Sequence, residues 1–412
     1  MIKFNWLKWI LYFVIALLTF EVLKRLVMRI DFSANYLVSI IFICLQTLVI
    51  LGFFYYALFA NIFKKKLKRG KLLLYFSISF VCLVALSELL FTYWLYHPAR
   101  IPSGLKWTYK YYYDTYNVRI LQFEKNIISF DNELLYKFKP NAEIDFSNAE
   151  FNTPIRINQY GFRDDNASAV GPEIICLGDS FTMGWGIGES ESFPEILEKK
   201  TGKKVLNTGI SSYGTARELI LMERLDTSQL KYIIIQYCYN DMEENIPFIA
   251  NNNKLSLTPL PVFKSILRTY EPSRKYFPGK NFLMVSQLWM KEQLNKIFPL
   301  FKLSGQAYEK EFDSKEHASS FLKVLIKFRE KYKNVKLIVT QVDISKYRDS
   351  NFIDELNRQA ATLPPGEREN IIFVNSAKDL TDKDYFILDS HINASGHEKV
   401  ADRLFEAIKQ NP

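Results

Sequence analysis

Residues 174–186 read IICLGDSFTMGWG, an apolar run that stops abruptly at Gly178-Asp179-Ser180. A short, continuous apolar run bounded by turn residues is typical of a strand that is buried on both faces, as strands are in a parallel sheet. Reactive groups in such sheets lie at the carboxyl ends of the strands. The run therefore predicts a buried strand at 174–177 that presents Ser180 at an edge of the sheet.

Apolar runs alternate with helical patterns from residue 173 to the C-terminus. Strands are predicted at residues 174–177, 204–206, 232–237, 335–340 and 371–374. Helices are predicted at residues 193–200, 216–225, 317–331, 354–361 and 395–409. This alternation indicates an α/β fold in which helices cover both faces of a parallel sheet. We therefore predict a three-layer, doubly wound parallel sheet of flavodoxin-like type, preceded by transmembrane helices.

The sequence divides into three segments by composition. Residues 1–98 are predicted to form a membrane anchor with three transmembrane helices, residues 99–172 an aromatic-rich connecting region, and residues 173–412 the α/β domain. Residues 243–312 interrupt the alternation of strands and helices and contain several prolines. We interpret them as an insertion that forms a lid or a surface facing the membrane.

Three apolar stretches near the N-terminus are candidates for membrane spans. Residues 36–63 carry no charge, residues 72–96 carry only Glu88, and residues 6–30 form a third, less uniform stretch. A helix needs about 20 predominantly apolar residues to cross a bilayer. We interpret all three as spanning helices.

A cleaved signal peptide is the alternative for the first stretch. Glu21, Lys24 and Arg25 argue against it, because they stand where small residues would mark a cleavage site. Between residues 64 and 71 there are six Lys and Arg residues. The positive-inside rule places this loop and the N-terminus in the cytoplasm and everything after residue 96 outside it. We predict a multi-pass protein of the cell membrane with an extracytoplasmic catalytic domain.

Glu88 lies inside the third predicted span. A carboxylate within a membrane helix indicates a specific partner for its charge. One interpretation is a hydrogen bond to a neighbouring helix or to the interface. The other is contact with a membrane partner protein.

Composition excludes several functional classes. The formal net charge is +9, and a basic cluster beside apolar runs favours an anionic membrane surface over nucleic acid. The histidines form no HExxH pattern, and no phosphate-binding loop of the GxxxxGKS type occurs. We expect no metal, no cofactor and no nucleic acid partner. The cysteines form no CxxC pair and are predicted to be small buried residues: Cys44, Cys82, Cys176 and Cys238.

A serine hydroxyl becomes a good nucleophile when a base removes its proton, and that base is usually a histidine oriented by a carboxylate. Residues 388–397 read LDSHINASGH, in which Asp389 lies two residues before His391. Taken alone, a turn serine or a loop histidine is explained by local hydrogen bonds. Because Ser180 and His391 both follow predicted strands, we interpret them as one site.

Two further strand ends offer hydrogen-bond donors. Asn240 follows the strand at 232–237, and residues 207–215 follow the strand at 204–206. A tetrahedral intermediate requires donors aimed at its oxyanion. We expect the Asn240 amide, the Ser180 N–H and an N–H of the 207–215 loop to supply them.

Four ordered blocks of this sequence resemble those of the SGNH (GDSL-type) esterases: Gly178-Asp179-Ser180, the loop from Asn207 to Gly214, Asn240-Asp241, and Asp389-x-His391. The resemblance implies that Ser180 is the nucleophile, that Asp389 and His391 activate it, and that Ser180, Ser212 and Asn240 hold the oxyanion.

This sequence departs from the common pattern in three places. Asp389 and His391 are two residues apart, where many members have three, and the shorter spacing resembles the branch that adds or removes acetyl groups on bacterial polysaccharides, including the alginate O-acetylation proteins. Ser212 stands where the second block usually has glycine, so the loop needs a conformation that serine tolerates. Cys238 lies two residues before Asn240, where the third block usually has glycine.

The resemblance and the predicted anchor imply a membrane-anchored serine esterase or O-acyltransferase. It would act on acetyl esters of a cell-envelope polysaccharide through an acyl-serine intermediate, and its partners would be an acylated glycan and the lipid bilayer. The alternative is a catalytically weak SGNH-like scaffold subunit of a membrane complex, with a membrane partner protein. A third possibility is a lipid esterase that uses the insertion as a lid.

Overall fold

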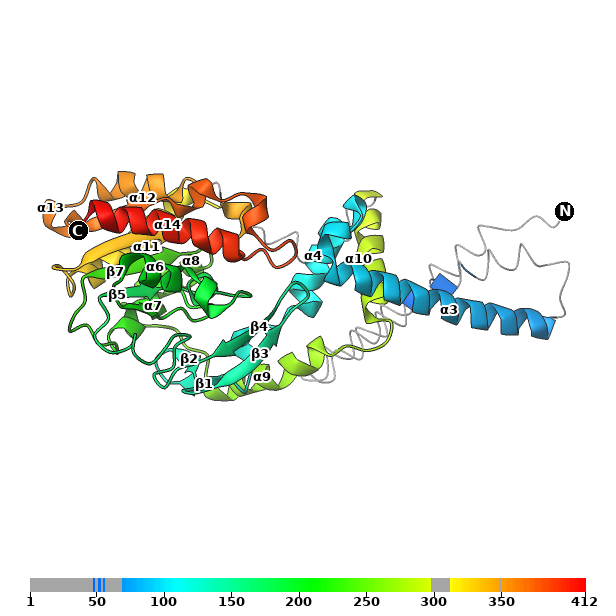
Figure 1. Ribbon diagram of the computed structural model, residues 1–412. Helices are drawn as coiled ribbons and strands as arrows, with labels where there is room; N and C mark the ends of the chain where they lie inside the picture. The colour runs from blue at the N-terminus through cyan, green and yellow to red at the C-terminus, as the bar shows by residue number, and fades with distance from the viewer. Residues whose placement is uncertain (1–46, 49–50, 53–54, 56–68, 298–311, 349) are drawn as a thin grey trace. The chain divides into compact units, whose positions relative to one another are not determined.

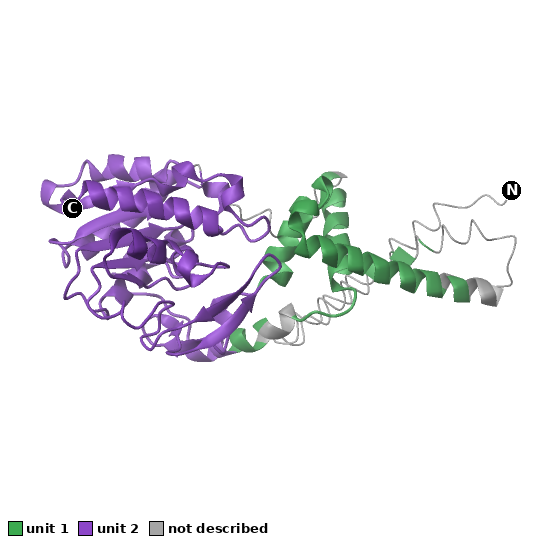
Figure 2. Cartoon of the chain, in the orientation of Figure 1, with its two compact units in different colours: residues 1–118, 265–309 green, residues 119–264, 310–412 purple. Residues whose placement is uncertain are grey.

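The computed structural model describes residues 47–48, 51–52, 55, 69–297, 312–348 and 350–412. The chain forms two compact units (Figure 2). Unit 1 comprises residues 1–118 and 265–309, and unit 2 comprises residues 119–264 and 310–412. Most of the predicted connecting region therefore belongs to the same unit as the α/β domain, whereas part of the predicted insertion belongs to the unit of the predicted anchor.

Unit 2 is built on a parallel sheet of five strands (Figure 1). The strands are β5 (Ile174–Leu177), β6 (Val205–Asn207), β7 (Tyr232–Tyr237), β8 (Lys336–Gln341) and β9 (Ile371–Val374). Their order across the sheet is β6-β5-β7-β8-β9, and every pairing is parallel. This confirms the predicted α/β fold with a parallel sheet. The order corresponds to 2-1-3-4-5, the flavodoxin-like arrangement, whose topological switch point lies between the first and third strands, here β5 and β7.

Helices cover both faces of this sheet. The helices are α6 (Phe193–Thr201), α7 (Thr215–Met222), α8 (Asp241–Ala250), α11 (Ser314–Arg329), α12 (Phe352–Ala360) and α14 (Ala394–Gln410). The helix α14 packs on α6, and α11 packs on α8, α12 and α7. One continuous core joins α6 and α14 to alternate residues of β5 and β7, including Cys176 and Ile234. Because parallel crossovers are right-handed, the second group of helices covers the opposite face.

Two antiparallel hairpins precede the sheet in the chain. The strand β1 (Ile128–Asp131) pairs with β2 (Leu135–Phe138), and β3 (Glu143–Ser147) pairs with β4 (Asn152–Arg156). The aromatic side chains Phe138 and Phe146 on these hairpins are buried. The segment is therefore a packed part of unit 2.

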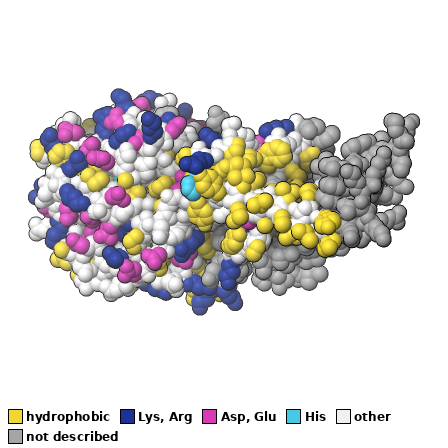
Figure 3. Space-filling view, turned by 45° about the vertical axis from the view of Figure 1, so that its right-hand side comes forward, with side chains coloured by type: hydrophobic (Ala, Val, Ile, Leu, Met, Phe, Trp, Pro, Cys, Tyr) yellow, Lys and Arg dark blue, Asp and Glu magenta, His cyan; other side chains and the backbone are white. Residues whose placement is uncertain are grey.

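The described part of unit 1 consists mainly of helices. They are α3 (Arg69–Tyr96), α4 (Lys106–Tyr112), the end of α9 (Leu260–Arg274), and α10 (Lys280–Ile297), and α10 packs on α3 and α4. Within α3, residues 77–96 form the one stretch of the described residues that is long and apolar enough to cross a membrane. Its leucine side chains are largely exposed, for example Leu86 and Leu89, and the unit displays a broad apolar surface (Figure 3). The predicted spans at 6–30 and 36–63 fall almost wholly outside the described residues.

Glu88 is buried in unit 1. Its carboxylate accepts the backbone N–H of Phe282 at 2.7 Å and that of Asn281 at 3.3 Å, and it accepts the Tyr276 hydroxyl at 3.0 Å. Because α10 begins at Lys280, these N–H groups belong to its first turn, where they lack intrahelical acceptors and attract negative charge. Glu88 therefore caps a neighbouring helix of the same chain.

Candidate active site

Ser180 lies directly beyond β5, at the first position of the short helix α5 (Ser180–Met183). The Asp179 carboxylate accepts the Phe181 N–H at 2.9 Å and so caps this helix. Position 178, just before Asp179, requires glycine, because a Cβ there would stand 2.0 Å from Thr182 Oγ1 and 2.5 Å from Gln236 Oε1. The Gly-Asp-Ser sequence therefore produces a tight turn that presents the hydroxyl of Ser180.

The fold brings Ser180 and His391 together although 211 positions separate them in the chain. Ser180 Oγ lies 2.8 Å from His391 Nε2, and His391 Nδ1 hydrogen-bonds to Asp389 Oδ1. The imidazole stacks on Trp185, with 4.8 Å between ring centroids, which fixes its plane. A hydroxyl, an imidazole and a buried carboxylate in series are the arrangement that activates a serine nucleophile.

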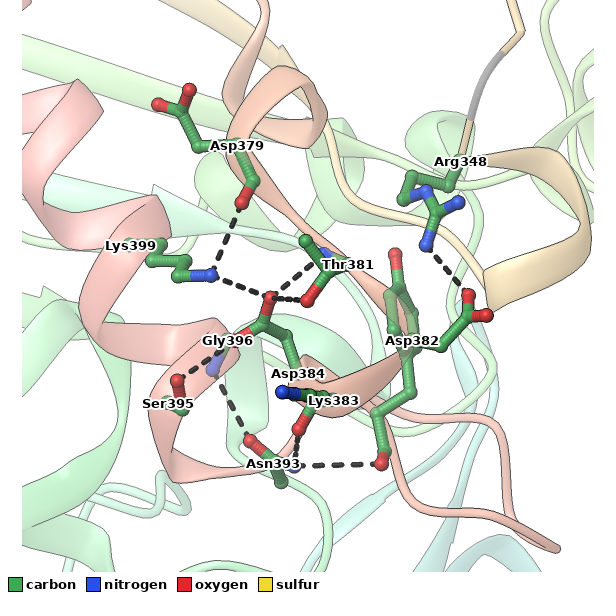
Figure 4. Close-up of polar contacts among 11 residues, drawn as sticks. Arg348, Asp379, Thr381, Asp382, Lys383, Asp384, Asn393, Ser395, Gly396 and Lys399 are labelled. Atoms are coloured by element: carbon green, nitrogen blue, oxygen red, sulfur yellow. Dashed lines mark hydrogen bonds and ion pairs between the residues drawn. The ribbon is translucent and has the colours of Figure 1, made fainter.

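The base of the loop that carries Asp389 and His391 is held by Asp384. Figure 4 shows Thr381, Ser395 and Lys399 pointing toward its carboxylate, with donor distances of 2.9, 2.8 and 2.6 Å. Burial alone would raise the pKa of Asp384, but these donors outweigh it and lower the pKa to about 2. The ionised carboxylate thus ties the start of the loop to the first turns of α14.

Asn393 closes the other side of the same loop. Its side chain accepts the Gly396 N–H at 3.3 Å as the N-cap of α14 and donates to the Lys383 carbonyl at 2.8 Å (Figure 4). A β-bridge joins Tyr385 to Ile392. Both ends of the loop are therefore anchored.

The loop that carries Ser212 lies against the turn formed by Gly178, Asp179 and Ser180. The Ile210 N–H donates to the Gly178 carbonyl at 3.2 Å. Ser212 has φ of 61°, in the left-handed region, which accounts for the glycine that the family pattern has here. Its hydroxyl accepts from Gln122 Nε2 at 2.8 Å, a contact that supports serine in this conformation.

Asn240 follows β7 and stands at the start of α8. Ser212 and Asn240 line one cavity of about 360 Å³ together with Arg217, Glu243 and Glu244. Two of the predicted oxyanion residues thus share one cavity. It lies at the carboxyl edge of the sheet, beside the switch point between β5 and β7.

Cys238 is buried beneath this edge. Its thiol donates to Asp343 Oδ1 at 3.5 Å, and Asp343 Oδ2 accepts the Tyr239 N–H at 3.0 Å. Burial raises the pKa of the thiol well above its ordinary value, so Cys238 stays a neutral thiol. Cys176 is likewise a free, buried cysteine, as predicted, whereas Cys82, also predicted to be buried, is a free and exposed cysteine on α3.

A buried arginine and a buried aspartate that the sequence did not single out hold two segments of the site. The Arg163 guanidinium donates to the carbonyls of Met183, Gly184 and Ile187, in the segment that follows Ser180. Asp164 Oδ2 accepts the Asn207 N–H at 2.7 Å, at the start of the Ser212 loop. No local pattern distinguishes such an Arg-Asp pair from surface residues, because its partners lie far away in the chain.

Three buried carboxyl groups make the stability of the protein fall as pH rises. Burial raises the pKa of Asp164 to about 8, of Asp343 to about 7 and of Asp179 to about 6. Unfolded aspartates ionise near pH 4, so between about pH 4 and 8 the unfolded state binds fewer protons and is increasingly favoured. We expect a lower free energy of unfolding at pH 8 than at pH 5, measured by urea denaturation, and a smaller difference in Asp164→Asn.

Asp145→Asn, on the exposed face of β3, is the matched control and is expected to keep the wild-type difference. An Asp164→Asn protein with an unaltered pH dependence would contradict the assignment of the effect to Asp164.

Within the described ranges, no three histidine, cysteine, aspartate or glutamate side chains converge closely enough to hold a metal ion.

No protein-family model and no curated protein matches this sequence. Among solved structures, the chain is similar to a protein from Desulfitobacterium hafniense DCB-2 described as lipolytic and of the G-D-S-L family, at 15% identity over 57% of this chain and 97% of that chain, with a TM-score of 0.30. It is also similar to a family two carbohydrate esterase from Clostridium thermocellum, at 12% identity over 58% of this chain and 64% of that chain, with a TM-score of 0.33. At these identities and TM-scores, the hydrogen-bonded series Ser180–His391–Asp389, and not the likeness, indicates the chemistry of the site.

Proposed function

We propose that this chain is a membrane-anchored serine esterase or O-acyltransferase of the SGNH type, acting on acetyl esters of a cell-envelope polysaccharide. One observation carries the proposal. Ser180 Oγ lies 2.8 Å from His391 Nε2, and the other ring nitrogen of His391 is bonded to the buried Asp389. A serine with this surrounding can form an acyl-enzyme.

In the proposed reaction, His391 Nε2 accepts the proton of Ser180 while Oγ bonds to the ester carbonyl carbon. Asp389 holds the imidazole in the tautomer that leaves Nε2 free and stabilises the imidazolium that forms. The carbonyl oxygen becomes an oxyanion, which the Ser180 N–H, the Ser212 N–H and the Asn240 amide stabilise. His391 then protonates the departing alkoxide as the ester C–O bond breaks.

The acyl-serine is resolved by a second nucleophile. His391 removes a proton from water or from a sugar hydroxyl, whose oxygen attacks the acyl carbon and releases Ser180. Water gives hydrolysis, and a sugar hydroxyl gives acyl transfer.

The lining of the neighbouring cavity supports a hydroxyl-rich substrate over a lipid. Arg217, Glu243 and Glu244 line it beside Ser212 and Asn240. Charged and amide side chains bind hydroxyl groups well, whereas an acyl chain offers them no hydrogen-bonding group.

Membrane attachment is supported by α3. The exposed leucine, valine and tyrosine side chains on residues 77–96 would lose contact with water in a bilayer. We propose that the protein is multi-pass, with unit 2 outside the cytoplasm. A reporter that is active only in the cytoplasm, fused after Pro412, is expected to be silent.

Two measurements test the proposal, one on the full-length protein in detergent and one on cells. A serine-directed fluorophosphonate is expected to label Ser180, and Ser180→Ala is expected to abolish the labelling. Mass spectrometry of surface glycans from cells with Ser180→Ala is expected to show more acetyl groups for a hydrolase and fewer for a transferase. An unlabelled protein that co-purifies with a multi-span membrane protein would favour the scaffold function instead.

A further inference from the structure

Glu150 contacts the backbone of the loop that carries Asp389 and His391. It lies in the turn between β3 and β4, more than 230 positions upstream. Its carboxylate accepts three consecutive N–H groups: that of Ile387 at 2.7 Å, that of Leu388 at 2.6 Å and that of Asp389 at 2.9 Å. One side chain therefore fixes the peptide groups that lead into the buried Asp389 carboxylate.

The backbone at this point requires such support. Ser390, between Asp389 and His391, has φ of 67°, in the left-handed region. A non-glycine residue in that region costs free energy and persists where the surrounding structure enforces it. The sharp bend at Ser390 is what allows Asp389 and His391, only two residues apart, to bond to each other. The Glu150 contact lies immediately before this bend.

The two carboxyl oxygens of Glu150 suit this role. Burial raises the pKa of Glu150 above its ordinary value, and the backbone N–H groups of Asp389, Ile387 and Leu388 oppose part of that rise. A carboxylate with two oxygens can hold three N–H groups at once, which an amide side chain with one acceptor oxygen does less well.

Two other side chains that precede β5 in the chain also bind loops of the candidate site. Gln122 donates to the Ser212 hydroxyl, and Asp164 accepts the N–H of Asn207. Each of the two loops that are expected to act with Ser180 is thus held by a side chain from residues 119–172. This part of the chain lies in the region that was predicted to connect the anchor to the α/β domain.

We propose that Glu150 is a positioning residue for the Asp389–His391 pair, so that the segment upstream of β5 is part of the catalytic apparatus. The inference rests on the proposed function. Glu150 acts through the backbone N–H groups that its carboxylate accepts. It sets the distance between His391 and Ser180 by holding the peptides of residues 387–389, and a displacement of about 1 Å at a reacting group costs about 10²-fold in rate.

The test compares full-length wild type with Glu150→Ala and Glu150→Gln in detergent. With p-nitrophenyl acetate, we expect kcat to fall about 10²-fold in Glu150→Ala and less in Glu150→Gln, while KM changes less than about twofold, because the contact acts on the transition-state geometry and not on substrate binding. Glu143→Gln is the matched control, since Glu143 is an exposed carboxylate on the same hairpin, paired with Arg156. It is expected to keep the wild-type kcat.

Hydrogen exchange provides a measurement that does not depend on activity. Amides 387–389 are expected to exchange faster in Glu150→Ala than in wild type, while the strands β5 and β7 keep their protection. Unchanged exchange at 387–389, or a wild-type kcat in Glu150→Ala, would overturn the positioning role. A fall in kcat accompanied by loss of protection throughout unit 2 would also overturn it, because the effect would then be general unfolding. An inactive wild-type protein would instead overturn the proposed function.

Discussion

Ser180→Ala is expected to lower kcat/KM for an acetyl ester by about 10⁴- to 10⁶-fold, the loss seen when the nucleophile of a serine triad is removed. The hydroxyl of Ser180 is hydrogen-bonded to His391, and its removal deletes the atom to which the acyl group would be transferred. The loss should fall on kcat, since the Ser212 loop, Asn240 and the cavity that they line are unchanged. The measurement is steady-state hydrolysis of p-nitrophenyl acetate by the full-length protein.

Ser190→Ala is the control, because Ser190 is an exposed serine only ten residues after Ser180. It is expected to retain the wild-type rate. His391→Ala and the double variant should lose about as much as Ser180→Ala, because residues that act as a unit are not additive. Full esterase activity in Ser180→Ala would refute the mechanism.

Gly209→Ala is expected to have the second-largest effect, on both rate and stability. A Cβ at this position would stand 2.2 Å from the Met183 nitrogen and 2.8 Å from the Met183 Cα. These are backbone atoms of α5, the helix that begins at Ser180, so no side chain can rotate to relieve the clash. The loop that carries Ser212 would have to move away from the nucleophile. We expect kcat to fall about 10²-fold and the protein to lose about 1–3 kcal/mol of stability.

Gly366→Ala is the matched control, because a Cβ at Gly366 would meet no atom within 4 Å. It is expected to leave both quantities near the wild-type values. The thermal midpoint separates the two effects of Gly209→Ala, since a loop displacement changes kcat even at temperatures where the variant is fully folded. A variant with the wild-type kcat would show that the loop does not need its contact with α5.

The sheet and its helices could be predicted from the sequence because their signals are local. The predicted strands at 174–177, 232–237 and 371–374 coincide with β5, β7 and β9. Continuous apolar runs of four to six residues specify strands that are buried on both faces, and few other structures accommodate them. Five of the six helices that cover the sheet agree with prediction to within three residues at each end. The sixth, α8, was not predicted and lies mostly in residues 243–312, which were interpreted as an insertion.

Only part of the loop geometry could be predicted from the sequence. The pairing of Ser180 with His391 followed from two strand ends and a known pattern of blocks. Glu150, Arg163 and Asp164 did not, because their partners are backbone groups that any residue possesses. The sequence of residues 387–389 therefore does not indicate that a carboxylate accepts their three N–H groups. Such contacts become visible only when the chain is folded.

The hydrogen bonds of Glu88 affect which fragments of the protein can be prepared in soluble form. A shortened gene product that starts at Arg119 would lose α3 and α4 yet keep α10, whose buried Leu283, Met284 and Leu288 pack in unit 1. Those side chains would then face water, and the first turn of α10 would lose its carboxylate. We therefore expect such a fragment to precipitate, and a soluble catalytic preparation requires a second excision, of residues 265–309, in addition to removal of the N-terminal region.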